Sequence, residues 1–138
     1  MQYWLVKSEP ETWSWQDQVD AGTTEWDGVR NYQAAKNLKT MKKGDRALFY
    51  HSGKAREVVG IVEITREYYP DPTDKSERFG MVDVKTVKAL PEPVTLKQIK
   101  AEDKLGHLAL VRQPRLSVMP VDAEAWKRIC AMGGLNKG

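Results

Sequence analysis

The stretch V-V-G-I-V-E-I-T-R, from Val58 to Arg66, is the strongest guide to the fold, because it is rich in β-branched residues and alternates as a strand does. In a strand, successive side chains point to opposite faces of the sheet. One face of this strand would carry Val58, Gly60, Val62 and Ile64, and the other would carry Val59, Ile61 and Glu63. A glycine inside a strand suits a bend or a bulge, so we expect one at Gly60.

Similar runs on both sides of this stretch predict further strands. They are rich in valine, isoleucine and aromatic residues. The predicted strands are Tyr3 to Lys7, Arg46 to His51, Met81 to Ala89, Leu108 to Val111 and Arg115 to Val121. The segment from Tyr68 to Arg78 is polar and rich in turn-forming residues, so we expect an exposed loop there.

Short helices are predicted between these strands, most of them by a capping residue at the start and a glycine near the end. The first begins at Thr12 or Ser14 and ends before Gly22, the second runs from Asn31 to Lys43-Gly44-Asp45, the third from Thr95 to Lys100, and the last from the cap Asp122 to Gly133-Gly134. The helical spacing turns Ala34, Leu38 and Met41 inward in the second helix, and gives Trp126, Ile129 and Cys130 one face of the last.

The order of these elements favours an α+β fold. Strands outnumber helices and do not alternate with them regularly, which argues against a doubly wound parallel sheet. We expect a small, mostly antiparallel β-barrel with short peripheral helices at its mouth, where a ligand can bind. The 138 residues contain no repeat, linker or low-complexity tract, so the prediction is one domain over residues 1–138.

Composition excludes some classes of protein and leaves others open. The net charge of +3 is compatible with a polyanionic partner, but a charge this small is also common in proteins that never touch nucleic acid. The single Cys130 excludes an internal disulfide and a cysteine-rich metal site, and we expect a buried, inert thiol. No apolar run approaches the roughly 20 residues that span a bilayer, so we expect a protein of the cytoplasm, or of the nucleus in a eukaryote.

Three stretches crowd aromatic and hydrogen-bonding side chains together: Trp4 to Pro10, Glu25 to Ala34 and Leu48 to Gly53. A pocket for a flat heterocycle needs this mixture, because bases are held by stacking and by hydrogen bonds to their edges. The candidate base-pocket residues are Lys7, Ser8, Glu9, Trp26, Asn31, Tyr32, Tyr50, His51 and Ser52.

Each of these residues also has a plain structural interpretation. Ser8 and Glu9 either bind a base edge or form a strand end with a serine turn and a surface ion pair. Trp26 is either a stacking surface or a lid on the core. Asn31 is well suited to cap a helix, and this role alone would explain it.

Cationic residues supply candidate phosphate ligands. Lys36, Lys39 and Lys43 follow helical spacing and form a basic ridge, which is either a phosphate track or a solvated helix face. Arg112 and Arg115 flank Gln-Pro and would clamp a phosphate, or one of them would turn inward to pair with Glu9 or Glu25. The phosphate-binding set is therefore Arg30, Lys36, Lys39, Arg112 and Arg115.

Signatures of catalysis are weak. The chain has no G-x-S-x-G, no H-E-x-x-H and no glycine-rich phosphate loop. His51 and His107 are the only histidines and lie far apart in sequence, so we predict no metal and no cofactor.

Five motifs, in order, resemble those of the EVE domain family over about the whole chain: W-L-V-K-S-E-P from Trp4, W-D-G-V-R-N-Y-Q-A from Trp26, G-D-R-A-L-F-Y-H-S from Gly44, Y-P-D-P-T from Tyr69 and L-V-R-Q-P-R-L-S-V-M-P-V from Leu110. The resemblance implies a PUA-like β-barrel, related to YTH readers of methylated adenosine in RNA and SRA readers of methylated cytosine in DNA. It also implies binding of modified bases, cytosine derivatives in DNA especially, at the barrel mouth.

Carried onto this sequence, the resemblance gives roles to matching residues. Lys7 and Ser8 would hold the base edge, and Trp26 would form one aromatic wall. Phe49, Tyr50, His51 and Ser52 would form the opposite wall, and Arg112 and Arg115 the basic loop. YTH readers have a second tryptophan at that opposite wall, and this chain does not, so His51 or Tyr50 would take its place.

The function predicted from the sequence is non-catalytic capture of a modified base, with modified cytosine in DNA foremost. Two other functions remain open: reading modified RNA, and hydrolysis of acylated cytidine as in ASCH-type relatives. The hydrolase would use the lysine, hydroxyl and carboxylate of Lys7, Ser8 and Glu9, but consecutive strand residues point to opposite faces, which argues against it.

Overall fold

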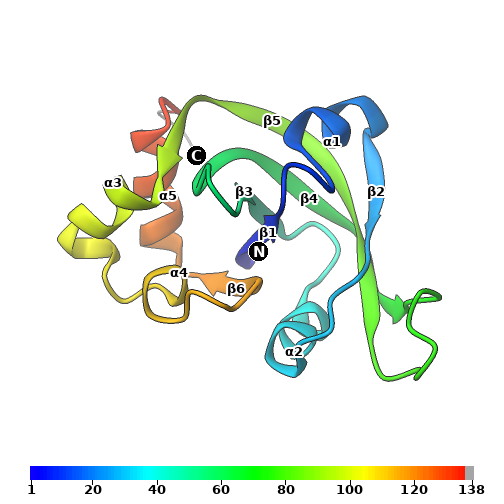
Figure 1. The fold of residues 1–138 in the computed structure, drawn as a ribbon. Helices are drawn as coiled ribbons and strands as arrows, with labels where there is room; N and C mark the ends of the chain where they lie inside the picture. Colours follow the sequence, from blue (N-terminus) through cyan, green and yellow to red (C-terminus); the bar gives the residue numbers. More distant parts are fainter. Residues whose placement is uncertain (136–138) are drawn as a thin grey trace.

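The computed structural model describes residues 1–135, which form one six-stranded sheet with five α-helices and a short 3₁₀ helix (Figure 1). The strands are β1 (Tyr3–Ser8), β2 (Thr23–Trp26), β3 (Arg46–His51), β4 (Glu57–Pro70), β5 (Gly80–Thr95) and β6 (Val118–Val121). The helices are α1 (Trp15–Ala21), α2 (Tyr32–Thr40), α3 (Leu96–Ala101), η1 (Asp103–Leu105), α4 (Ala109–Arg112) and α5 (Ala123–Met132). None of these helices is long and apolar enough to cross a membrane.

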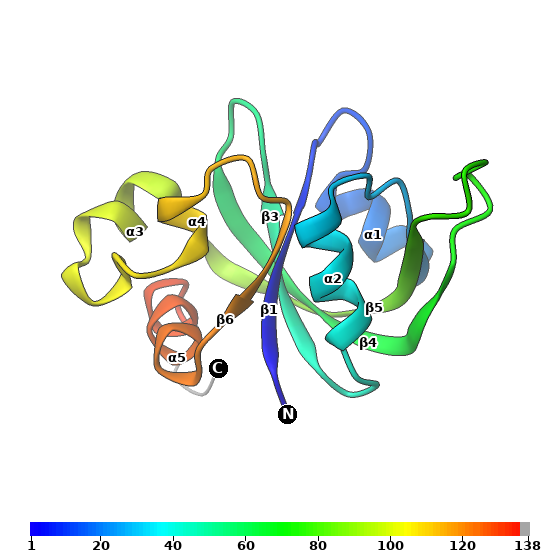
Figure 2. The same cartoon turned by 90° about the horizontal axis from the view of Figure 1, so that it is seen from below.

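The strand order β2-β5-β4-β3-β1-β6 confirms the α+β class but not the closed barrel. Only β1 and β3 are parallel, and the other neighbours are antiparallel. Within residues 1–135 the edge strands β2 and β6 do not pair with each other, so the sheet stays open. Each edge strand has only 4 residues, which is too short to complete a barrel wall, although β4 and β5 curve strongly around the core (Figures 1 and 2).

Shifts in register explain the curvature of the two long strands. The pairing of β4 with β5 shifts at several places, and one shift spans Val58 and Gly60. An irregularity of this kind bends a strand and increases its twist. The prediction of a bend at Gly60 is therefore confirmed.

Gly60 has a second role, which is to admit the indole of Trp15 at the start of α1. A Cβ at position 60 would lie far inside van der Waals contact with the Trp15 ring. The same ring packs edge-on against Phe49 of β3, with 5.2 Å between centroids. The missing side chain thus lets α1 pack directly onto the sheet.

The predicted helix caps are confirmed in the structure. Ser14 accepts from the Asp17 amide at 3.0 Å, and Asn31 accepts from the Ala34 amide at 2.9 Å. Asp122 accepts from the Ala125 amide at 3.2 Å and so caps α5. The inward faces are confirmed as well: Ala34, Leu38, Met41, Trp126, Ile129 and Cys130 are all buried.

Two predicted strands and the predicted loop were wrong in whole or in part, and one strand was missed. Residues 109–112 form α4 rather than a strand, and β6 starts at Val118 instead of Arg115. A short apolar run does not distinguish a strand from a buried turn of helix, which explains these errors. The predicted loop from Tyr68 is strand as far as Pro70, and β2 was not predicted because its sequence T-T-E-W is mostly polar.

Asp45 joins the start of β1 to the start of β3. Its buried carboxylate accepts from the Gln2 amide at 3.0 Å, the Trp4 indole at 3.1 Å and the Lys42 amide at 3.0 Å. These bonds hold the two parallel strands in register at the end where both begin. The opposite end, where both strands stop, is fixed as a consequence.

Replacing Gly60 by alanine should destabilise the protein by about 1–3 kcal/mol, because the new methyl group displaces the Trp15 ring from the sheet. Urea denaturation of the variant and the wild type measures the difference. Gly106→Ala is the matched control, since a Cβ there would be 3.6 Å from its nearest neighbour, an ordinary contact. Equal stability of Gly60→Ala and wild type would contradict the role given to this glycine.

Candidate functional site

The parallel pairing of β1 and β3 brings two of the three polar aromatic stretches together. Lys7 lies beside Tyr50, and Ser8 lies beside His51. The Ser52 amide donates to the Ser8 carbonyl at 2.9 Å, just beyond the end of β3. Figure 2 shows the loops that follow β1 and β3 at the same end of the molecule, with the segment that precedes β6 between them.

Alternation divides these residues between two faces of the sheet. Side chains of neighbouring strands in register share a face, so Ser8 and His51 lie on one face and Lys7 and Tyr50 on the other. The structure therefore does not gather all the predicted pocket residues around one point. Glu9 is exposed in the loop between β1 and α1.

On the Ser8 face, four rings form a cluster around Phe49. The rings of Trp15, Trp26 and His51 all meet Phe49 edge-on, with centroids 5.2, 5.5 and 5.7 Å away. Trp26 is only 7% exposed, so little of its ring reaches the surface. Trp15 was not among the predicted site residues, although its position directly after the cap Ser14 indicates that it starts a helix.

The polar atoms on this face hold the loop between β1 and α1. The Ser8 hydroxyl donates to the Trp13 carbonyl at 2.5 Å, and His51 Nε2 accepts from the Trp15 amide at 2.9 Å. Burial lowers the pKa of His51 from 6.5, against an opposing effect of Glu57, so the ring is neutral at pH 7. Because Nε2 accepts, the ring proton is on Nδ1, and within residues 1–135 no protein group accepts it.

On the other face, Lys7 fixes the segment that precedes β6. Its Nζ donates to the Pro114 carbonyl at 2.9 Å and lies 5.6 Å from the centroid of the Tyr50 ring. Burial lowers the pKa of Lys7 and raises that of Tyr50. Tyr50 is buried and Lys7 is half-buried, so of the two only Lys7 reaches the surface here.

A cavity opens next to this segment, between it and the start of α2. Its volume is about 290 Å³, near the lower end of the range of roughly 300–1,000 Å³ for small-molecule pockets. It is lined by Asn31, Gln33, Gln113, Pro114, Arg115 and Leu116. Asn31 and Arg115 are thus brought together as predicted site residues, while Gln33 and Gln113 were missed because exposed glutamines carry no distinctive pattern.

Arg30, in the segment before α2, and Tyr32, the first residue of α2, contact the loop between β4 and β5. Arg30 donates to Asp71 at 3.1 Å and to Thr73 at 2.9 Å, and the Tyr32 ring lies 5.0 Å from that of Phe79. The guanidinium of Arg30 is therefore already engaged with a carboxylate. Its contribution as a phosphate ligand is reduced accordingly.

Asp71 is the anchor of this loop. Burial raises its pKa, but hydrogen bonds from Thr73, the Gly28 amide and Arg30 outweigh that effect and hold the pKa at about 2. The carboxylate thus stays charged in the folded protein at all ordinary pH values. It connects the segment before α2 to the loop after β4.

The remaining predicted cations lie on the surface. Lys36 is exposed on α2, and Lys39 Nζ lies 5.5 Å from the centroid of the Tyr68 ring. Arg112 Nε donates to the Gly106 carbonyl at 3.1 Å. In the part of the chain that the structure describes, neither Arg112 nor Arg115 pairs with Glu9 or Glu25, so the inward-turned arrangement was wrong.

Residues 1–135 contain neither a cluster of metal-ligating side chains nor a reactive thiol. No three histidine, cysteine, aspartate or glutamate side chains gather there as metal ligands. Cys130 is buried, as predicted, and burial raises its pKa to about 11. A thiol with that pKa is an inert core group.

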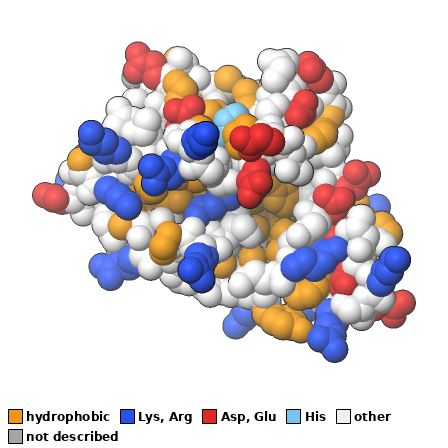
Figure 3. All heavy atoms as spheres, in the orientation of Figure 1, with side chains coloured by type: hydrophobic (Ala, Val, Ile, Leu, Met, Phe, Trp, Pro, Cys, Tyr) orange, Lys and Arg blue, Asp and Glu red, His pale blue; other side chains and the backbone are white. Residues whose placement is uncertain are grey.

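The face shown in Figure 3 is hollowed at its centre, where hydrophobic side chains form the floor. Lysine and arginine side chains gather on the half of this face that Figure 1 gives to α3, α4 and the turn between β3 and β4. The charge of +3 is therefore unevenly distributed. A surface of this kind favours a polyanionic partner on one side.

Replacing Asp71 by asparagine should lower the stability at neutral pH and remove part of the acid sensitivity. The wild type loses this contribution as the pH falls from about 4, the ordinary value, towards the folded pKa of about 2. The asparagine variant has no such contribution to lose, so the two stabilities should converge in that interval. Urea denaturation at several pH values checks this, with the exposed Asp27→Asn as control; a constant difference for Asp71→Asn would contradict it.

Comparison with known proteins places this arrangement in a family. The EVE domain family model matches residues 2–132. Thymocyte nuclear protein 1 of Rattus norvegicus is 34% identical over 164 residues, which cover 94% of this chain and 73% of that protein. A crystal structure from Agrobacterium tumefaciens is 46% identical, with a TM-score of 0.97 over 100% of this chain and 97% of the other.

Two further structures extend the comparison. Human THYN1, solved in complex with 5-methylcytosine-containing DNA, is 31% identical, with a TM-score of 0.90 over 96% of this chain and 98% of the other. The YTH domain of Zygosaccharomyces rouxii MRB1 was solved with N6-methyladenosine RNA. It is 16% identical to this chain, with a TM-score of 0.60 over 96% of this chain and 86% of the other. At this identity the similarity shows a shared fold alone. The ordered motifs, the six-stranded sheet and the match over nearly the whole chain agree: this protein belongs to the EVE domain family.

Proposed function

We propose that this protein is a non-catalytic nucleic-acid-binding module that captures a modified base, with modified cytosine in DNA as the preferred ligand. The observation that carries the proposal is the likeness to human THYN1, which was solved with 5-methylcytosine-containing DNA and shares 31% of its residues with this chain at a TM-score of 0.90. The lysine and arginine side chains gathered on one half of the face in Figure 3, and the exposed polar side chains described above, are consistent with such a partner.

The cavity of about 290 Å³ beside α2 is the proposed position of the base. Asn31, Gln33 and Gln113 present amide donors and acceptors, which suit the edge of a cytosine. Lys7 supports the far wall by holding the Pro114 carbonyl at 2.9 Å. Arg115, which lines the same cavity, would donate hydrogen bonds to the phosphate of the captured nucleotide.

The face with Ser8 and His51 has a supporting role in this proposal. Its polar atoms fix the loop between β1 and α1, and they leave the Nδ1 proton of His51 without an acceptor within residues 1–135, so it can donate to a ligand. Trp26 is 7% exposed, so it offers an edge to a ligand, and its role as a stacking wall stays a prediction. In this proposal Ser52 and Tyr50 support the ends of β1 and β3 and do not contact the base. Glu9 lies exposed in the loop that follows β1.

The geometry gives little support to the amidohydrolase alternative. Lys7 and Ser8 lie on opposite faces, and each already donates to a backbone carbonyl, Pro114 for the lysine and Trp13 for the serine. A nucleophile and its base must lie within hydrogen-bond reach of each other. Capture without chemistry is therefore the function we propose.

A panel of oligonucleotides tests the proposal, with cytosine or 5-methylcytosine in otherwise identical DNA and RNA strands at one stated salt concentration. One buried methyl group is worth about 0.8 kcal/mol, so we expect the methylated DNA to bind about fourfold more tightly than plain DNA. Fluorescence anisotropy measures each affinity. Equal affinity for methylated and plain strands, in DNA and RNA alike, would refute base capture, and a preference confined to RNA would favour the modified-RNA alternative.

Asn31→Ser tests the cavity without disturbing the fold, because serine caps a helix about as well as asparagine but lacks the amide. We expect affinity for the methylated strand to fall about fivefold, the equivalent of one hydrogen bond of about 1 kcal/mol, with unchanged thermal stability. Gln16→Ser, which removes an exposed amide from α1 outside the cavity, is the matched control. If both variants bind like the wild type, the base is not read at Asn31.

A further inference from the structure

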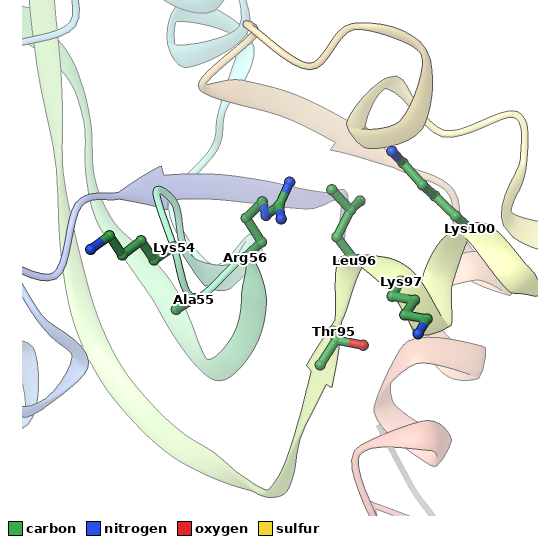
Figure 4. Close-up of a pocket in the computed structure, with 7 residues that line it drawn as sticks. All are labelled: Lys54, Ala55, Arg56, Thr95, Leu96, Lys97 and Lys100. Atoms are coloured by element: carbon green, nitrogen blue, oxygen red, sulfur yellow. The ribbon is translucent and has the colours of Figure 1, made fainter.

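A second cavity, larger than the one beside α2, lies between the turn that joins β3 to β4 and the beginning of α3 (Figure 4). Its volume is about 370 Å³, and its lining residues are Lys54, Ala55, Arg56, Thr95, Leu96, Lys97 and Lys100. Four of the seven are cations and none is acidic. We call these four residues, Lys54, Arg56, Lys97 and Lys100, the basic groove.

The cations of the basic groove are not neutralised by the protein. Arg30, Arg46 and Arg128 each lie within 4.0 Å of a carboxylate, at 3.1, 3.7 and 3.8 Å. Within residues 1–135, no member of the basic groove has such a partner, and all four are exposed. Like charges gathered without counter-charges repel one another, so an anion in the groove is electrostatically favoured.

The walls of the groove are held in place by the backbone. The Leu96 amide donates to the Arg56 carbonyl at 2.8 Å, and Glu57 pairs with Thr95 across β4 and β5. The Thr95 hydroxyl accepts from the Gln98 amide at 3.1 Å and starts α3. In Figure 4, Arg56 and Lys100 point into the space between the turn and α3, while Lys54 and Lys97 extend outward from its two sides.

Arg56 adopts a backbone conformation that is unfavourable for its residue type. Its φ of 45° lies in the left-handed region, which costs a residue other than glycine about 1–2 kcal/mol. Glycine would avoid that cost at this turn. Strain that is kept at one position points to a role for the side chain there, and the Arg56 guanidinium projects into the space between the turn and α3 (Figure 4).

The groove is also close to the proposed base site. Arg56 is near enough to Tyr50 for its positive charge to oppose the rise in the Tyr50 pKa that burial causes. Tyr50 pairs with Lys7, whose Nζ bonds Pro114 in the wall of the smaller cavity. The turn that carries Lys54 and Arg56 follows the end of β3, and β3 ends beside the end of β1, where Lys7 holds the wall of the smaller cavity.

We propose that Lys54, Arg56, Lys97 and Lys100 bind the phosphodiester backbone of the nucleic-acid strand that carries the captured base. This inference rests on the proposed function and adds a backbone track distinct from the cations on α2. It assigns the groove a contribution to affinity that is independent of base identity, because phosphate contacts carry no sequence information.

The double variant Lys97→Ala, Lys100→Ala tests the proposal, since both residues are exposed and alanine favours the helix. We expect binding to methylated and plain DNA to weaken by the same factor, and the slope of log K against log salt to fall by about 0.7–0.9 for each lost phosphate contact. The matched control is Lys75→Ala, Lys85→Ala, which removes the same charge from exposed positions outside both cavities. The control should keep the wild-type slope.

Arg56→Gly provides a second, independent test. Glycine relieves the backbone at φ 45° while removing the guanidinium, so we expect equal or higher thermal stability together with weaker binding. Higher stability with unchanged affinity and unchanged salt slope would overturn the role given to Arg56.

The two proposals fail in different ways. If the wild type binds methylated and plain DNA equally but the groove variants still lower the salt slope, base capture fails and the groove stands. If methylated DNA is preferred but the groove variants match the wild type, or lose no more than the control, the groove proposal is overturned.

Discussion

The parallel pairing of β1 with β3 is the constraint on which the arrangement of the site depends. Two parallel strands end at the same edge of a sheet, so the residues that follow them meet there whatever the distance between them in sequence. Asp45 fixes this pairing from the other end through bonds to Gln2, Trp4 and Lys42. A slip of one residue would break these bonds and exchange the faces on which Lys7 and Ser8 lie. The polar ends of both strands are useful only in this register.

Local features of the fold were predictable from the sequence, and non-local features were not. The helix starts were predicted correctly at Ser14, Asn31 and Asp122, because a capping side chain bonds an amide within three residues of itself. The closure of the sheet depends on whether β2 and β6 reach each other, and no local pattern carries that information. Strand alternation is a local rule, and it already placed Lys7 and Ser8 on opposite faces, but which residues join each of them there depends on the non-local pairing of β1 with β3. The lining of the smaller cavity by Gln33 and Gln113 depends on the contact between the segment before β6 and α2, which only the folded chain creates.

The charges illustrate the same limit. Counting lysines and arginines gives a net charge of +3, which says little about a partner. The folded chain pairs Arg30 with Asp71, which offsets part of the charge of one predicted phosphate ligand. It gathers four other cations around one hollow without a carboxylate among the lining residues. Lys54 and Arg56 come from a turn, and Lys97 and Lys100 come from a helix about forty residues later in the chain. Sequence separation hides such a cluster, because the pairing of β4 with β5 creates it.

The two hollows would contribute different parts of the binding free energy. Taking a base out of its stack costs a few kcal/mol, and burying its methyl group offsets only about 0.8 kcal/mol of this cost. A cavity of about 290 Å³ with a few amide groups therefore cannot extract a base and also bind it tightly without further contacts. Phosphate contacts supply affinity that does not depend on the base, and this affinity offsets the cost of extraction for modified and plain bases alike. Under the two proposals discrimination rests on the cavity alone, so a change in the cavity lining would alter the preferred base, whereas a change in the basic groove would alter the affinity for all bases alike.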